Sequence, residues 1–463
     1  MATVSPASDF APVAASAAAP AARVRDPRLD FYRGIAMFII LIAHIPNDPW
    51  AKWIPARFGF SDATEIFVFC SGMASAIAFG GAFLRKGWWM GTARVAFRIW
   101  QVYWAHICLF FFVAMSMAAL DNSGLFEKSY VSSLNLQHFF NDPLPQMVGI
   151  FTLTYVPNYF DILPMYLVVL AMMPLYMALY RVSFWLMAAV SIAIWLVAQT
   201  GALALPAEPW SDRQWFFNPF GWQLLFFTGF AFMRGWIPAP PVSKTLIWAA
   251  IAFLVLSAPI GSWKVFLWVQ SAAPGLAEQI REIWPLTKEL RGKTEFGLFR
   301  YIHFLSLAYL GWVVAGEHGH RLIATGHSVG ARIWQVVLKL ITKVGQQSLA
   351  VFVFSMALAR LIGFTFDHHR ANPDFIRLVM VENTHDARHL RASQAIAGMN
   401  RPAIDTLCAI IARGEAAGVM RAGLDPVALH WQISAMCLFN VANRPTFSTI
   451  YGADLFTEAG QAC

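Results

Sequence analysis

Charged side chains are scarce in this chain. Asp, Glu, Lys and Arg make up only 13% of its 463 residues, whereas 58% are hydrophobic. A typical soluble domain carries about a quarter charged residues. The composition therefore excludes an ordinary soluble protein and indicates a chain that lies largely within a lipid bilayer.

The sequence also lacks the short motifs of several enzyme classes. It contains no Walker loop, no GxGxxG after a strand, no HExxH and no CxxC. Its five cysteines show neither metal-ligand spacing nor a disulfide framework. These absences argue against an ATPase, a dinucleotide-dependent enzyme and a zinc hydrolase, and neither a bound metal nor a permanently bound cofactor is expected.

Long apolar runs are what the chain has instead. Nine of them are long enough, or nearly long enough, to cross a bilayer: 31–45, 64–84, 95–120, 162–181, 183–204, 215–233, 245–260, 299–316 and 346–366. The net charge of +8 comes from Lys and Arg clustered between these runs, which is typical of membrane anchoring. The predicted fold class is all-α, a polytopic bundle of about 9–10 transmembrane helices, with the lipid bilayer as partner and no nucleic acid.

The pattern changes near both ends of the chain. Residues 1–24 are rich in Ala, Pro and Ser, which predicts a disordered tail. After residue 366 apolar residues recur at helical spacing between polar faces, so 367–463 is predicted to be a small soluble α-helical segment. The transmembrane domain is then 25–366.

Basic residues predict the orientation in the membrane. They gather before the first run and between the second and third runs, and the positive-inside rule places both groups in the cytoplasm together with the N-terminus. The same count puts 261–298 outside, although this loop carries five cations. Either the count is off there or these cations bind something anionic.

Arg33 and His44 stand eleven residues apart in the first apolar run, LDFYRGIAMFIILIAHIPNDPW. On a helix they lie near one face, roughly 16 Å apart along the axis. Ionisable residues at membrane depth are costly and are functional candidates by default. Pro46 would end or kink the helix beside His44, and irregular backbone there is tolerated only against protein or a wet cavity. His44 is therefore a candidate general base, with a satisfied buried histidine as the alternative.

Acidic residues accompany this pair. Asp30 lies one turn before Arg33 and can hold the guanidinium in a defined pose, unless Arg33 is only a membrane anchor. Asp62 and Glu65 open the second run, FSDATEIFVFCSGM. One of them could orient His44 if the first two helices form a hairpin, or they could simply cap the second helix.

Other polar groups lie at the ends of the apolar runs. Arg94 and Arg98 are one turn apart, a spacing that suits phosphate clamping and equally suits membrane anchoring. Contacts with an anionic substrate are possible for five further residues: His106, Asp161, Lys293, Arg300 and His303.

Seven blocks of this sequence resemble successive blocks of the OpgC branch of integral-membrane acyltransferases. They are RLDFYRGIAMFIILIAHIPNDP, FGFSDATEIFVFCSGM, the Arg94/Arg98 segment ARVAFRIWQVYWAH, FDILPMY, WFFNPFGWQLLFFTGF, GKTEFGLFRYIHFLSLAYL and GQQSLAVFVFS, in that order over about 25–366. The spacing from Arg33 to His44 is similar to the Arg-x10-His signature of the wider acyltransferase-three superfamily.

The resemblance implies an O-acyltransferase of the bacterial inner membrane. Succinyl-CoA, an acyl-CoA, would be the donor substrate, and hydroxyls of osmoregulated periplasmic glucans would be the acceptors. His44 would deprotonate the sugar hydroxyl, with Asp30, Arg33 and Glu65 completing the catalytic set. Arg33 would also contact the acyl-CoA, and Arg94 and Arg98 would suit its phosphates.

The C-terminal segment resembles something else. ANPDFIRLVMVENTHDARHLR, MNRPAIDTLCAIIARGEAAGV and ISAMCLFNVANRPTF look like the effector and dimerisation helices of TetR-type repressors. No DNA-reading helix-turn-helix precedes them, so a repressor function does not follow. A gene fusion, or a frameshift or assembly error, that replaced a tenth span would explain the combination.

Two other functions fit parts of the sequence. A secondary transporter or exporter would share the composition and the buried ionisable residues. A membrane-tethered sensor could use the C-terminal segment as its ligand-binding module. The sequence shows no inverted repeat between its halves, and Arg33 and His44 fit the acyltransferase signature, so the acyltransferase is the leading hypothesis.

Overall fold

The computed structural model describes five stretches of the chain, residues 26–46, 48–124, 128–392, 401–418 and 420–451. The predicted disordered tail, 1–24, lies outside them. Within these stretches the regular elements are helical, without a strand, and Pro206 and Gln214 form an isolated β-bridge. The all-α prediction is confirmed.

The elements follow one another with short connections. The longer helices are α1 (Pro27–His44), α2 (Ala63–Ser75), α4 (Trp88–Asn122), α7 (Pro143–Thr152), α8 (Ile162–Val182), α9 (Phe184–Gln199), α10 (Pro219–Arg234), α11 (Lys244–Gly261), α12 (Trp263–Ala272), α13 (Pro274–Leu286), α14 (Leu298–Ala315), α15 (Val329–Gln346), α16 (Ser348–Ala371), α17 (Pro373–Thr384), α19 (Arg401–Ala416) and α20 (Pro426–Ala442). The shorter helices are α3 (Gly81–Arg85), α5 (Tyr130–Ser133), α6 (Gln137–Asn141), α18 (Arg388–Ala392) and α21 (Arg444–Tyr451). Single turns are η1 (Pro49–Lys52), η2 (Pro55–Arg57), the π-turn η3 (Ala76–Gly80), η4 (Glu289–Arg291) and η5 (Glu317–Leu322).

Six helical stretches of the described chain are long and apolar enough to cross a membrane. They are Ala63–Arg85, which joins α2, η3 and α3, and the helices α4, α8, α11, α14 and α16. The predicted multi-pass architecture is confirmed, but the expected count of 9–10 spans is higher. Of the other three runs, α9 and α10 have only 16 residues each, and α1 carries three charged residues among its first seven.

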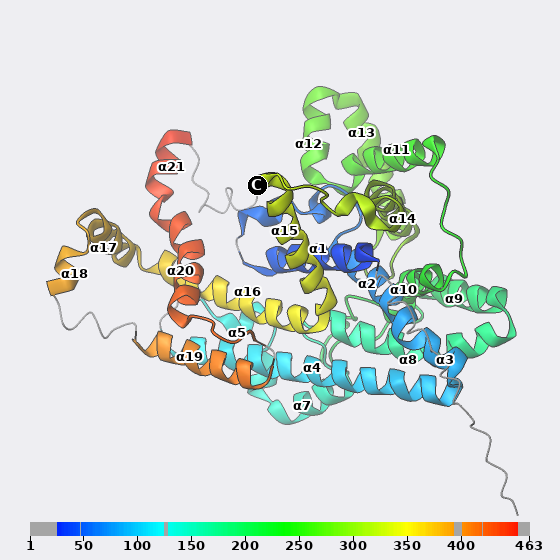
Figure 1. Ribbon diagram of the computed structural model, residues 1–463, viewed down its shortest axis with the longest axis horizontal. Coiled ribbons are helices and arrows are strands. Elements are labelled where there is room, and N and C mark those ends of the chain that lie inside the picture. The colour runs from blue at the N-terminus through cyan, green and yellow to red at the C-terminus, as the bar shows by residue number, and fades with distance from the viewer. Residues whose placement is uncertain (1–25, 47, 125–127, 393–400, 419, 452–463) are drawn as a thin grey trace, which may run out of the picture.

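Helix α1 lies at the centre of the bundle and packs against α2, α15 and α16 (Figure 1). Its contact with α15 is unusually close at Gly345, where an added Cβ would sit 1.8 Å from the backbone oxygen of Asp30. A larger side chain has no room there. This contact fixes the half of α1 that carries Asp30 and Arg33.

The C-terminal segment is attached through α16. This helix runs without a break through the expected boundary at 366/367 and ends at Ala371. Helix α20 packs against it, and Ile362, Phe366 and Cys437 share a buried apolar cluster (Figure 1). The two predicted domains therefore share one continuous helix.

The close contact at Gly345 generates a stability prediction. We expect Gly345→Ala to lower the free energy of unfolding by about 1–3 kcal/mol, because the new methyl group overlaps the α1 backbone. Thermal unfolding of the detergent-solubilised full chain measures it. Gly330→Ala on the same helix is the matched control, because a Cβ there meets nothing within 4 Å. Equal stability of the two variants would contradict the packing argument.

Candidate active site

His44 is the last residue of α1. Its Nδ1 lies 2.7 Å from the carbonyl oxygen of Ile40, one turn back. If Nδ1 carries the proton and donates it to that oxygen, the lone pair is on Nε2, which makes no hydrogen bond within the described chain. The imidazole is half-buried. The tautomer with the proton on Nδ1 leaves Nε2 able to accept a proton, as a general base requires.

Tyr159 and Arg360 form the wall beside His44. The Tyr159 ring meets the imidazole edge-on, with centroids 5.3 Å apart, and the Arg360 guanidinium carbon lies 3.9 Å from the centre of the same ring. Tyr159 comes from the loop before α8 and Arg360 from α16. The charges of Arg360, Lys293 and Asp62 all act on the imidazole. His44 thus stands at the edge of a charged cluster rather than in an apolar core.

Two ion pairs join the start of α2 to the start of α14. Asp62 pairs with Lys293, and Arg300 Nη1 lies 2.7 Å from Oε1 of the fully buried Glu65. The two acids also cap α2, since Asp62 accepts from the Thr64 N–H and Glu65 from the Asp62 N–H. Burial raises the pKa of Asp62, but the Lys293 ammonium and the hydrogen bonds to the carboxylate together outweigh burial, and the pKa lies below its ordinary value. Asp62 is therefore a carboxylate at neutral pH.

The loop that carries Lys293 is held by its backbone. The indole N–H groups of Trp222 and Trp195 donate to the carbonyl oxygens of Lys293 and Phe296, both at 2.9 Å. The Gln199 amide donates to the Glu295 carbonyl at 2.7 Å. These bonds satisfy buried carbonyl groups that water cannot reach, and they fix Lys293 beside Asp62.

Asp30 and Arg33 lie nearer the opposite end of α1. The Arg33 guanidinium donates to the hydroxyl of Ser348, the first residue of α16, and the Gln346 amide lies 3.4 Å from a carboxylate oxygen of the buried Asp30. One end of α1 thus meets the start of α16, while the other end meets Arg360 through Tyr159. The two helices run side by side in the same direction.

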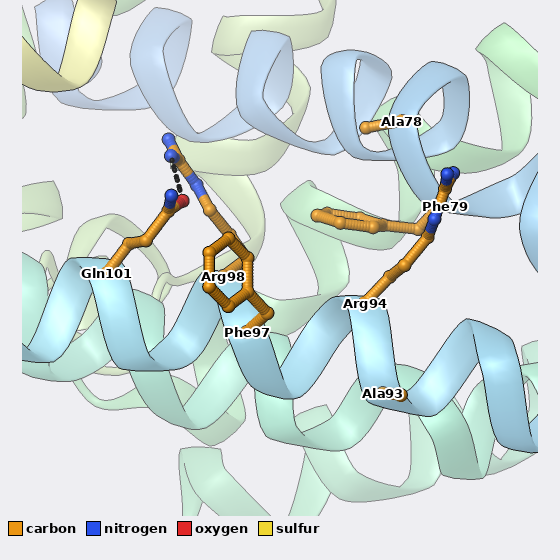
Figure 2. Close-up of a pocket in the computed structure, with 7 residues that line it drawn as sticks. All are labelled: Ala78, Phe79, Ala93, Arg94, Phe97, Arg98 and Gln101. Carbon is orange, nitrogen blue, oxygen red and sulfur yellow. Dashed lines mark hydrogen bonds between the residues drawn. The ribbon is translucent and has the colours of Figure 1, made fainter.

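Arg94 and Arg98 line a separate groove between α4 and η3, with a volume of about 390 Å³ (Figure 2). Both side chains project from one side of α4 toward the helix opposite, on either side of Phe79. Arg98 donates to the Gln101 amide oxygen at 3.1 Å. Arg33 is not among the residues that line this groove, and it bonds instead to Ser348 at the start of α16.

The remaining predicted substrate residues do not all lie in the same place. His303 bonds to the Ser61 hydroxyl beside Asp62 and belongs to the same cluster as Lys293 and Arg300. His106 is fully buried, and its ring nitrogens have no hydrogen-bond partner among the described residues. Asp161 is buried at the start of α8, and burial raises its pKa to about 6 against the opposing charge of Arg213.

The structure shows how Asp62 and Glu65 are bonded. Asp62 and Glu65 do not hydrogen-bond to His44 in the described chain, because both carboxylates are taken up by α2 capping and by Lys293 and Arg300. Capping, the alternative reading of these two acids, is confirmed. The catalytic role of Glu65 stays a prediction, as do the roles of the other site residues.

Sequence reasoning missed Tyr159 and Arg360. Arg360 is a charge inside an apolar run, the same signal that singled out Arg33, and it could have been found that way. Tyr159 carries no such signal, because its role depends on a loop conformation and on contacts far along the chain. Among the described residues, no cluster of three His, Cys, Asp or Glu side chains could hold a metal ion.

Comparisons with known proteins cover both parts of the chain. The family described as "OpgC protein" matches residues 25–382, and the family "Tetracyclin repressor-like, C-terminal domain" matches 355–462. The HTH-type transcriptional repressor NicS of Pseudomonas putida is 30% identical over 106 residues, which is 23% of this chain and 50% of NicS. The chain thus spans about half the length of this curated relative. No solved structure was found to match. The chain belongs to the OpgC protein family and carries, at its C-terminus, a segment like the C-terminal domain of tetracycline-type repressors.

Proposed function

We propose that this protein is a membrane O-acyltransferase that moves a succinyl group from succinyl-CoA to hydroxyl groups of osmoregulated periplasmic glucans. Its location would be the bacterial inner membrane, with a cytoplasmic N-terminus. The observation that carries the proposal is His44 at the end of α1, whose Nε2 has no hydrogen-bond partner in the described chain and whose imidazole is within reach of the charges of Arg360, Lys293 and Asp62. Membership of the OpgC protein family supports it.

The chemistry follows from that nitrogen. The glucan hydroxyl gives its proton to His44 Nε2 as its oxygen attacks the thioester carbonyl carbon. A carbon–oxygen bond forms, the carbon–sulfur bond breaks, and the coenzyme A thiolate leaves and takes up a proton. The two substrates would enter the bundle from opposite faces. The protein would hold the attacking hydroxyl oxygen roughly 3 Å from the thioester carbonyl carbon.

Donor and acceptor would approach from opposite sides. Arg94 and Arg98 lie in the segment that the positive-inside rule assigns to the cytoplasm, where an acyl-CoA is found. Their two guanidinium groups, one turn apart along an open groove, suit the phosphates of coenzyme A. Arg33 lies at the same end of α1 as the N-terminus and would contact the donor further in.

The transporter hypothesis is weaker. Transporters typically build their sites from broken helices at the midplane of two repeats. Here the charged cluster lies where α1 ends and where α2 and α14 begin, and its acids are already neutralised by Lys293 and Arg300. His44 keeps its Nε2 without a hydrogen-bond partner in the described chain.

The first test removes the base. His44→Ala is expected to lower acyl transfer about 10²- to 10⁴-fold, the usual contribution of a general base. The assay is the succinyl content of periplasmic glucans from a deletion strain complemented with each variant. His327→Ala, at an exposed histidine, is the control for handling and expression. Fully succinylated glucan from the His44→Ala strain would rule out this assignment.

A second test concerns the donor groove. The double variant Arg94→Gln/Arg98→Gln is expected to raise KM for acyl-CoA about tenfold or more while kcat changes little, because the contacts are made to the phosphates and not to the reacting atoms. Arg85→Gln, a neighbouring exposed arginine outside the groove, controls for membrane anchoring. An unchanged KM in membrane vesicles would show that both arginines only anchor the helix.

A further inference from the structure

The cations near His44 are not equivalent. Lys293 is neutralised by Asp62, and Arg300 by Glu65. Arg360 has no ion-pair partner among the residues that the structure describes, and its Nε is buried without a hydrogen bond there. Its guanidinium lies instead over the Tyr159 ring. Arg360 is thus the cation of this cluster whose charge no neighbouring carboxylate balances.

An unbalanced guanidinium at this depth is costly. A half-buried charge is normally paired, and contact with an aromatic face contributes only about 0.5–2 kcal/mol. Arg360 is set into the bundle by α16, one turn before Gly363, where an added Cβ would sit 2.8 Å from the Pro46 ring. This close approach fixes the α16 backbone that carries Arg360. Such a residue is expected to bind an anion supplied from outside the chain.

Tyr159 is a fixed support for that cation. Its backbone is in the left-handed region, with φ of 85°, which costs a non-glycine residue about 1–3 kcal/mol and marks functional sites. Its hydroxyl donates to the Met356 carbonyl at 2.5 Å, one turn before Arg360 on α16. The ring contacts both the Arg360 guanidinium and the His44 imidazole.

The position of the cation limits the anion. Arg360 and the candidate base both contact the Tyr159 ring, so an anion on Arg360 would lie near an acyl carbonyl placed for attack beside His44. A short acyl chain that ends in a carboxylate fits this spacing. A planar guanidinium with several donors matches a carboxylate in geometry as well as charge.

We propose that Arg360 binds the free carboxylate of a dicarboxylic acyl group and so selects succinyl over uncharged acyl donors. This inference rests on the proposed acyltransferase function. Succinyl and acetyl donors carry the same coenzyme A phosphates and differ at the acyl end. Comparing them therefore separates a carboxylate contact from a phosphate contact.

The test measures kcat/KM for succinyl-CoA and acetyl-CoA in membranes that contain equal amounts of full-length protein. Arg360→Gln is expected to lower the succinyl value about 10- to 100-fold, the usual effect of losing a charge-assisted contact, and to leave the acetyl value within about twofold. Arg360→Lys, which keeps the charge but loses the planar fork, should fall between. Arg377→Gln on α17, an exposed arginine whose partner is the exposed Asp374, is the control.

Two results of the kinetic comparison would overturn the inference. An equal loss for both donors would mean that Arg360 binds coenzyme A or only supports the fold, and an unchanged preference for succinyl would mean that Arg360 does not contact the acyl group.

A second measurement does not depend on acyl transfer: succinate should raise the unfolding temperature of the wild-type protein in detergent and not that of Arg360→Gln. Wild-type protein that succinate stabilises but that transfers no acyl group would contradict the proposed function while leaving the carboxylate site in place. No stabilisation of the wild type would remove the site.

Discussion

The contact between α1 and α16 is the constraint on which the site depends. At one end the Arg33 guanidinium bonds to the Ser348 hydroxyl at the start of α16. At the other end, three turns on, Tyr159 fills the space between His44 and Arg360. Because α1 and α16 are linked at two levels, a rotation or slide of either helix would break one of these contacts.

The charged cluster at the start of α2 supports this arrangement from the other side. Four charges are brought together there, and each acid meets a base, so that the helix N-terminus, the ion pairs and the capping bonds compensate one another. Burying Glu65 completely is tolerable only with Arg300 beside it. Once these groups are paired internally, they are poor candidates for reacting with a substrate. Beside this cluster, His44 Nε2 has no hydrogen-bond partner and Arg360 has no ion-pair partner within the described chain.

Much of the fold could be predicted from the sequence by rules that depend only on near neighbours in the chain. Apolar length identified the helices, and the Asp62 and Glu65 pattern predicted a capped helix start, because both depend on neighbours within one or two turns. Apolar runs gave nine candidate spans whereas six described helices are long and apolar enough to cross a membrane, because hydropathy alone does not distinguish a lipid-facing helix from the short, largely buried α10. The pairing of Lys293 with Asp62 was not predictable, since it joins residues 231 positions apart through a loop held by indole and amide donors. Tyr159 was missed for the same reason.

The junction between the two parts of the chain falls on the helix that completes the site. The two family matches overlap over 355–382, a stretch that includes Arg360. Within this stretch α16 packs against two neighbouring elements. Gly363 lets the end of α1 approach at Pro46, and Ile362, one residue earlier, packs with Cys437 of α20. Successive residues of a helix point about 100° apart, so these demands fall on different faces and one helix can meet both. The C-terminal segment therefore does not merely follow the membrane domain. It buries an apolar side of α16 that would otherwise face lipid or water, and it does so within one turn of Arg360.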